Sequence, residues 1–176
     1  EFGHNVMHGL YYLMNDPMVE GARFECDNVA PAEEWKHGHN YIHHTYTNVI
    51  GMDRDIGYNM FRIDEDQPWY PSHRFNLPLA FMLMLLFEWG VMYHGVELDE
   101  YLAGRVSKEE FKARKKRAMH KIGRQVLKDY VLFPAVALVA IAPFTTWWAP
   151  VIVLAANVIA NIIRNIWTFL IIFCGH

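Results

Sequence analysis

The sequence predicts an all-α integral membrane protein in which a transmembrane helical hairpin is joined to cytoplasmic helices that carry histidine motifs. Apolar residues make up 53% of the 176 residues, and aromatic residues make up 15%. No charged side chain occurs from Val131 to Ile163, which is too long and too apolar a run for a soluble or disordered chain. Basic residues concentrate just before that run: residues 101–128 hold ten Lys and Arg but two Glu, in a chain of formal net charge −3.

Residues 1–76 are expected to form a cytoplasmic region that holds the histidine motifs. Apolar residues recur at near-helical spacing in 1–15, which predicts a first helix. A second helix is predicted over 32–46, because Pro31 precedes it and acidic residues occupy its first turn. The remainder of the region is rich in Gly, Asp and Pro, which predicts loops.

The next two segments are expected to lie at or outside the membrane surface. Residues 77–96 are apolar but contain Glu88 and His94, which are costly at bilayer depth, so we predict an interfacial or re-entrant helix. We interpret His94 as a surface or interface residue. Residues 97–129 predict a basic cytoplasmic helix, because Lys and Arg are retained on the cytoplasmic side. We interpret its charge as a solvated face, although acidic headgroups or an acidic electron donor could use it.

Residues 130–176 predict the transmembrane hairpin. Apolar runs of 18 and 23 residues, at 131–148 and 151–173, approach the roughly 20 residues that cross a bilayer. Two tryptophans end the first run and a proline follows before the second, as expected for a turn at a membrane–water interface. A hairpin returns the chain to the side that it left, so His176 lies on the same side as the basic helix. It shares that side with the other histidines only if 77–96 does not span.

Histidines are unusually frequent, and six of the ten fall within the first 44 residues. His4 and His8 form an H-x-x-x-H motif on the first predicted helix, where residues four apart share a face about 5–6 Å apart. His39, His43 and His44 form an H-x-x-x-H-H motif on the second helix. His44 there points about 100° away from His43, which would serve two metal ions. Two such motifs so close together favour a metal site over solvated or core histidines, while imidazole alone does not choose between iron, zinc, copper and nickel.

Polar residues beside these motifs are candidates to orient the histidines. Asp53 and Asp55 follow the second motif, and they either accept hydrogen bonds from ligand N–H groups or form a polar turn. Asn5 and Asn40 each directly follow a motif histidine and have the same candidate role. His37 stays ambiguous between ligand and surface residue.

The last apolar run carries polar residues that are rare in a membrane span. Such groups usually face the bundle interior or a cavity. Asn165 and His176 share a helix face, because their directions differ by about 20°. We therefore expect Asn161, Asn165 and Thr168 to line a substrate channel that ends at His176, with interhelical hydrogen bonding as an equal alternative for Asn157 and Asn161.

In their wider context, the two histidine motifs resemble those of the membrane-bound fatty acid desaturases. The segments GHNVMHG and WKHGHNYIHHTYTNVIGMDRDIGY carry the resemblance, especially to bacterial acyl-lipid and acyl-CoA desaturases, and EDQPW and NIWTFLIIFCGH extend it over essentially the whole chain. The resemblance implies two non-haem iron ions on the cytoplasmic face and O2-dependent removal of two hydrogens from a fatty acyl chain. It also implies electrons from a separate ferredoxin- or cytochrome b5-type donor. The ligands that it implies are His4, His8, His39, His43, His44 and His176.

Two features depart from the pattern of this family. An asparagine precedes the last ligand by four residues in the animal acyl-CoA branch, whereas this position is Ile172 here. The family's third histidine box, usually two adjacent histidines, has no match. Because histidines lie near both ends and no methionine begins the sequence, we expect an internal piece of a longer protein.

Three other classes of protein are alternatives. A related di-iron hydroxylase, ketolase or epoxidase shares the same motifs and differs in its product. A histidine-lined metal-ion transporter would place its ligands within the spans, whereas five motif histidines lie in polar segments. A zinc hydrolase would need a carboxylate base such as the Glu of H-E-x-x-H, which is absent from both motifs. Membrane lipids and an acyl substrate carried by coenzyme A, a carrier protein or a lipid are the expected partners, and nucleic acid is not.

Overall fold

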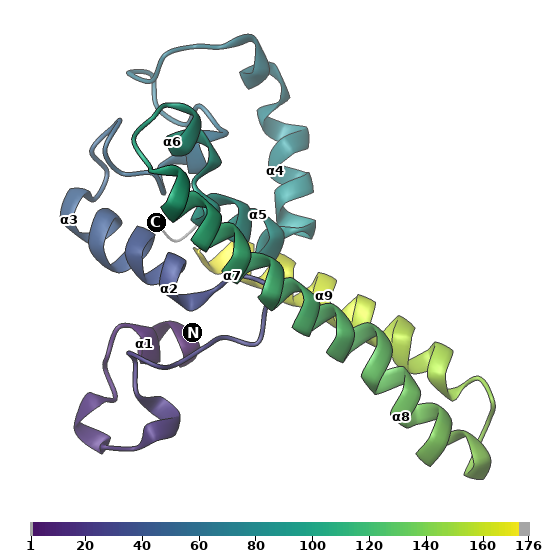
Figure 1. The fold of residues 1–176 in the computed structure, drawn as a ribbon. Helices are drawn as coiled ribbons and strands as arrows, with labels where there is room; N and C mark the ends of the chain where they lie inside the picture. The colour runs from purple at the N-terminus through teal and green to yellow at the C-terminus, as the bar shows by residue number, and fades with distance from the viewer. Residues whose placement is uncertain (1, 173–176) are drawn as a thin grey trace.

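The computed structural model describes residues 2–172, in which the regular secondary structure is helical, with no β-strand among these residues (Figure 1). This confirms the all-α prediction. Short helices that carry the histidine motifs gather at one end of the molecule, and a long pair of helices extends away from them (Figure 1). The motif region therefore lies at one end of that pair.

The N-terminal segment folds differently from the helix predicted over 1–15. Helix α1 (Phe2–Met7) ends early, and two 3-10 turns follow, η1 (Tyr12–Met14) and η2 (Pro17–Val19). The chain turns at Gly9, whose φ of 77° is a conformation that glycine adopts without steric cost. The prediction was therefore wrong beyond the first two turns of this helix.

The second predicted helix is confirmed over 32–46, with an irregular centre. It consists of α2 (Ala32–Trp35), a π-helical segment η3 (Lys36–His43) and α3 (His44–Tyr46). π-Helical turns are rare and occur often at functional sites. Here the irregular segment holds most of the second histidine motif. Loops follow, with 3-10 turns η4 (Gly57–Asn59) and η5 (Pro71–Phe75).

The apolar segment predicted at 77–96 is two helices rather than one. Helix α4 (Asn76–Leu85) and helix α5 (Phe87–Val96) belong to a pair bent by 102°. Such a bend belongs to either a broken span or a re-entrant loop. The interfacial or re-entrant placement of this segment stays a prediction.

The basic helix predicted over 97–129 consists of two helices, and the helical path continues beyond residue 129. Helix α6 (Leu98–Leu102) ends near Gly104, whose φ is 75°. Helix α7 (Lys108–Leu127) begins after Ser107, whose hydroxyl accepts a hydrogen bond from the Glu110 amide at 3.1 Å and so caps the helix.

The basic helix continues directly into the hairpin. A π-helical segment η6 (Lys128–Leu132) joins α7 to α8 (Phe133–Ala140), and a 3-10 turn η7 (Ala142–Phe144) leads toward α9 (Ala149–Ile172). Helices α8 and α9 lie side by side (Figure 1). Both long stretches, Lys108–Phe144 and Ala149–Ile172, contain an apolar window long enough to cross a membrane, of which 17% and 11% is buried within the protein.

An apolar cluster fixes the bent pair to the end of α9. Phe61, Leu83, Phe87 and Phe169 are buried together, and the rings of Phe87 and Phe169 meet edge-on at 5.7 Å. Burial of each such side chain contributes roughly 1.5–3 kcal/mol. The cluster joins three helices with the loop that follows the second histidine motif.

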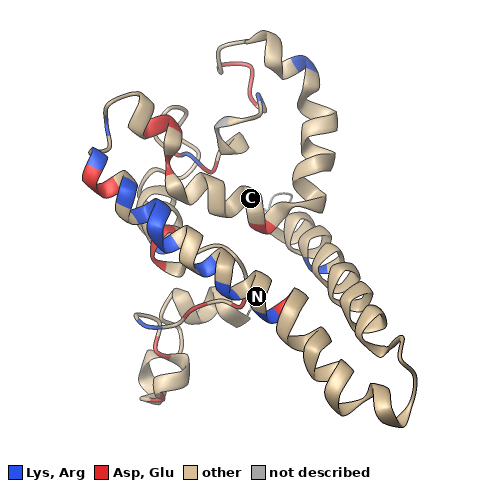
Figure 2. Ribbon diagram, turned by 45° about the vertical axis from the view of Figure 1, so that its right-hand side comes forward, with Lys and Arg blue, Asp and Glu red and all other residues tan. Residues whose placement is uncertain are grey.

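Positive charge gathers along α7, while the far part of the hairpin carries almost none (Figure 2). One side of the basic segment makes ion pairs with the histidine-bearing region: on α7, Arg117 Nε lies 2.6 Å from Glu34 and Lys121 contacts Glu25, and at the start of η6 Lys128 contacts Asp27. The interpretation of this charge as a solvated face was therefore correct for only the opposite side of α7, where the exposed lysines are Lys108, Lys112, Lys115 and Lys116.

Candidate metal centre

Three histidines from two separate elements converge on one point. The Nε2 atoms of His4 and His8 are 3.2 Å apart, and those of His4 and His39 are 3.3 Å apart. Ligand atoms of these three residues all lie within 4.8 Å of one another. Nitrogens bound at about 2.1 Å to one tetrahedral ion lie roughly 3.4 Å apart. The arrangement therefore fits three ligands of a single metal ion.

The other two motif histidines adjoin this group. The ring centroids of His43 and His44 lie 5.0 and 5.1 Å from that of His39, and the His8 ring is 4.9 Å from His44. A π-helical turn closes between residues i and i+5, so His39 and His44 come closer to one face than in an ideal α-helix. The five motif histidines therefore lie in one cluster.

Two carboxylates hold the outer nitrogens of the second motif. His43 Nδ1–H donates to Asp53 at 2.9 Å, and His39 Nδ1–H donates to Asp55 at 3.1 Å. A proton fixed on Nδ1 leaves the Nε2 lone pair available to a metal ion. Of the two roles that the sequence left open for these aspartates, the geometry therefore fits the orientation of ligands, and the donor set suits a divalent metal.

Asp53 is itself held rigidly. It is 3% exposed and accepts hydrogen bonds at 2.9 Å from the backbone N–H groups of Asn48 and Asp55. Asn48 has φ of 61°, and this conformation brings the chain back toward the helix that carries His43. The loop after the motif is therefore folded around the carboxylate.

The electrostatics of the cluster suit a bound cation. Burial, and then the neighbouring His4, His39 and His44, lower the pKa of His8 to about 4. Burial opposes ionisation of Asp55, but the hydrogen bond from His39 and the nearby His94 imidazole outweigh it and hold the pKa of Asp55 well below the ordinary value. At neutral pH the cluster therefore contains a neutral His8 and an ionised Asp55.

Two residues of the cluster were missed by the sequence analysis. Trp35 stacks on the His39 ring at 4.6 Å and meets the His4 ring edge-on at 5.4 Å. Its position four residues before His39 on a helix was a signal that could have found it. His94 was interpreted as a surface or interface residue, but its Nε2 lies 3.3 Å from Asp55 Oδ1, and no local pattern indicated this contact.

Three further candidates make contacts of other kinds. Asn40 donates to the Met7 carbonyl at 2.9 Å and so joins the second helix to the end of α1. Asn5 accepts from the Leu10 N–H through its backbone carbonyl at 3.2 Å. His37 is exposed and stacks on Tyr41 at 6.0 Å, on a side of the helix away from the cluster.

A mainly apolar cavity of about 220 Å³ borders the cluster. It extends from His4 to the polar residues of α9, and two of the channel candidates, Asn165 and Thr168, are among its lining residues. Asn161 does not: it donates to the Tyr130 hydroxyl at 2.8 Å, so the alternative of interhelical hydrogen bonding describes it. The apolar part of the wall comes from Met7, Ala30, Ala32, Trp35, Phe87, Val91 and Ile172.

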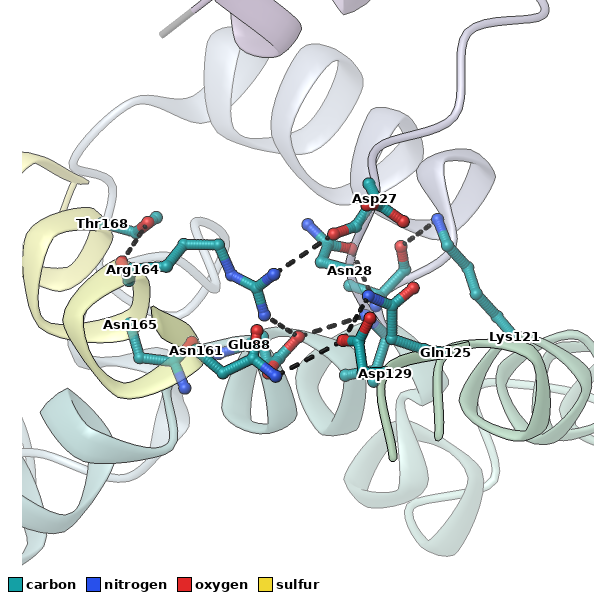
Figure 3. Close-up of polar contacts among 12 residues, drawn as sticks. Asp27, Asn28, Glu88, Lys121, Gln125, Asp129, Asn161, Arg164, Asn165 and Thr168 are labelled. Carbon is teal, nitrogen blue, oxygen red and sulfur yellow. Dashed lines mark hydrogen bonds and ion pairs between the residues drawn. The ribbon is translucent and has the colours of Figure 1, made fainter. Parts of the chain in front are cut away.

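Several polar residues that line this cavity also belong to a network of polar contacts (Figure 3). Arg164 of α9 lies 2.6 Å from the Glu88 carboxylate and donates to the Asp27 carbonyl at 3.3 Å. Asn165 accepts from the Glu88 N–H at 3.2 Å and donates to the Leu85 carbonyl at 3.0 Å. These bonds give partners to backbone groups at the bend between α4 and α5.

The sixth candidate ligand, His176, lies outside the described residues. Ile172, the last described residue, lines the cavities that contain His4, His43 and His94. The described end of α9 is therefore adjacent to the cluster.

Comparisons with known proteins agree with the resemblance. The family model for fatty acid desaturase matches residues 1–176. NADPH-dependent stearoyl-CoA 9-desaturases from two strains of Mycobacterium tuberculosis are 44% identical over 176 residues, which is 100% of this chain and 40% of each relative. An sn-1 linoleoyl-lipid 6-desaturase from a Synechocystis strain is 43% identical over 43 residues, 24% of this chain and 12% of that protein. No solved structure significantly matches the chain.

The chain thus spans 40% of the length of its mycobacterial relatives. The family match covers every residue, including both histidine motifs and the hairpin. The chain belongs to the fatty acid desaturase family.

Proposed function

We propose that the protein containing this chain introduces a double bond into a fatty acyl chain, in an O2-dependent reaction at a di-iron centre. The observation that carries the proposal is the position of His4, which lies in the histidine cluster and also lines the apolar cavity. An unactivated C–H bond must be held beside a redox metal and away from water for this reaction. Metal ligands at the wall of an apolar cavity provide that arrangement.

The five motif histidines would hold the irons, with His176 as a further ligand. When bound, iron supplies the oxidising chemistry that side chains lack. Asp53 and Asp55 keep the protons of His43 and His39 on Nδ1 and so aim their Nε2 atoms at the metal. Trp35 covers one face of the His39 ring and limits access of water to it.

The cavity would hold part of the acyl chain against the cluster. Phe87 and Val91 provide an apolar wall, and Asn165 and Thr168 stand on the side formed by α9. The name of the mycobacterial relatives favours a coenzyme A thioester such as stearoyl-CoA as the substrate. Their NADPH dependence favours an external donor, of ferredoxin or cytochrome b5 type, that NADPH reduces through a reductase.

The active site would lie on the cytoplasmic face of the membrane. Helix α7 carries the basic residues and runs into the first apolar stretch, and Lys and Arg are retained on the cytoplasmic side. The Arg117–Glu34 pair holds α7 against the helix of the second motif. The histidines would therefore lie on the same side of the membrane as α7. This placement requires α4 and α5 to return to the same side, as a re-entrant pair does.

Product analysis tests the proposal. The full-length protein would be supplied with stearoyl-CoA, NADPH and a reductase with its electron carrier, with and without O2, and the acyl products identified by gas chromatography–mass spectrometry. We expect an O2-dependent alkene that disappears in His39→Ala but persists in His37→Ala, which changes an exposed histidine outside the cluster. A hydroxylated or epoxidised product would instead favour the related oxygen-inserting enzymes, and full activity of His39→Ala would contradict the assigned site.

A further inference from the structure

One carboxylate of the candidate metal centre lies between two imidazoles from different parts of the fold. Asp55 Oδ2 accepts from His39 Nδ1–H at 3.1 Å, and Asp55 Oδ1 lies 3.3 Å from His94 Nε2. The His94 side chain is 12% exposed, and its ring meets Tyr58 edge-on at 5.1 Å. The largely buried His94 imidazole is within ion-pair distance of Oδ1, and a polar contact with one oxygen restricts rotation of the carboxylate.

We propose that His94 is a positioning residue of the metal centre: it holds the Asp55 carboxylate in the orientation that directs His39 Nε2 at the metal. This inference rests on the proposed function. It assigns a role to a histidine outside both motifs, on helix α5, which is otherwise part of the bent apolar pair.

The reason that Asp55 needs a second partner is a nearby competitor. Asp55 Oδ2 lies 3.1 Å from His39 Nδ1 and 3.9 Å from His43 Nδ1, which already donates to Asp53. Rotation of the Asp55 carboxylate would move Oδ2 between the two imidazoles and leave His39 without a fixed acceptor. The contact of His94 with Oδ1 opposes this rotation.

Further contacts hold the backbone next to His94 in place. Its backbone carbonyl accepts from the Glu97 N–H at 3.2 Å, and the Glu97 carboxylate lies 3.0 Å from Arg54 Nη1. Arg54 directly precedes Asp55, so two adjacent loop residues are tied to the end of α5. The position of His94 relative to Asp55 is therefore set by the ion pair as well as by its own contact.

Metal binding tests this role apart from catalysis. The full-length protein would be stripped of metal and titrated with Co²⁺, whose visible spectrum reports the coordination of its ligands. We expect His94→Leu to weaken Co²⁺ binding roughly 10–100-fold, the usual cost of losing an outer hydrogen-bond partner, and to alter the spectrum. His94→Gln keeps an N–H donor on a chain of similar reach, so it should restore most of the affinity. His120→Leu, an exposed histidine on α7, is the matched control and should leave both unchanged.

Several results would overturn the inference. Wild-type affinity and spectrum in His94→Leu would show that Asp55 needs no second partner. Equal weakening in His94→Leu and His94→Gln, with retained thermal stability, would indicate packing rather than a polar contact with Asp55. Failure of the wild-type protein to bind Co²⁺ would contradict both the proposed metal centre and this role of His94. If His94→Leu does not fold, weak binding by folded His94→Gln still contradicts the proposal.

Discussion

Replacement of Asp53 by asparagine is the sharpest test of how the site is held, because this carboxylate is fully enclosed. Asp53 Oδ2 accepts from His43 Nδ1–H and the Asn48 N–H, and Oδ1 accepts from the Asp55 N–H, each at 2.9 Å. Asparagine has nearly the same shape but offers one acceptor oxygen and one NH2 donor group. At least one of the three N–H groups must then face another donor.

The size of the effect follows from this count of bonds. The least costly arrangement puts the amide oxygen where Oδ2 lies, which weakens two charge-assisted bonds and leaves the Asp55 N–H unpaired. A bond to a charged group contributes about 1.5–3 kcal/mol, and a buried unpaired donor costs about 1–3 kcal/mol. We expect Asp53→Asn to reduce the free energy of unfolding by about 2–4 kcal/mol. It should also weaken metal binding roughly 10–100-fold, because the His43 proton loses its partner.

Thermal unfolding and metal competition would measure both effects on the full-length protein in detergent. Melting would be followed by circular dichroism with and without metal, and affinity would be measured against a chelator of known strength. Asp66→Asn is the control, because Asp66 is an exposed aspartate of the same loop region. If Asp53→Asn melts and binds metal like Asp66→Asn, the carboxylate does not orient His43 and the reasoning fails.

Three further predictions follow from the contacts around the site. Asn165→Leu leaves two backbone groups at the bend between α4 and α5 without partners, so its unfolding free energy should fall by about 2–4 kcal/mol, and a wild-type melting curve would contradict this role. Glu97→Gln removes one of the two carboxylate partners of buried Arg114, 2.7 Å away; because Glu110 still pairs with Arg114, the loss should be about 1.5–3 kcal/mol, whereas Arg105→Gln at an exposed pair should change the melting temperature little. The folded state lowers the pKa of His8 from 6.5 to about 4, so the unfolded chain takes up the proton first as pH falls. The metal-free protein should therefore lose stability between about pH 6.5 and 4, and a melting temperature that is constant over this range would contradict the burial of neutral His8.

The parts of the fold that could be predicted from the sequence depend on local patterns. The composition and length of the apolar runs were sufficient to predict the helical hairpin. Helical spacing, with Pro31 before the first turn, was sufficient to predict the helix over 32–46. The bend between α4 and α5 could not be predicted, because the partners of its backbone groups come from Asn165, 77 and 80 residues away. Gly9 and Gly104 adopt positive φ where the pattern was read as continuous helix.

The candidate site also contains features that local sequence patterns indicated and features that they did not. The i, i+4 spacing within each motif was visible, and the aspartates adjacent to the second motif could be weighed as partners. The approach of His4 to His39 joins residues 35 apart in sequence and depends on packing. The contact of His94 with Asp55 and the pairing of Arg117 with Glu34 also depend on long-range packing, so no local pattern indicated them.

The metal content of the full-length protein, measured by inductively coupled plasma mass spectrometry after growth with ample iron, tests the central claim most directly. We predict two irons per chain in the wild-type protein and in His37→Ala, and fewer in His39→Ala. Stoichiometric zinc, or no stoichiometric metal, in the wild-type protein would contradict the di-iron desaturase that the histidine cluster and its apolar cavity support.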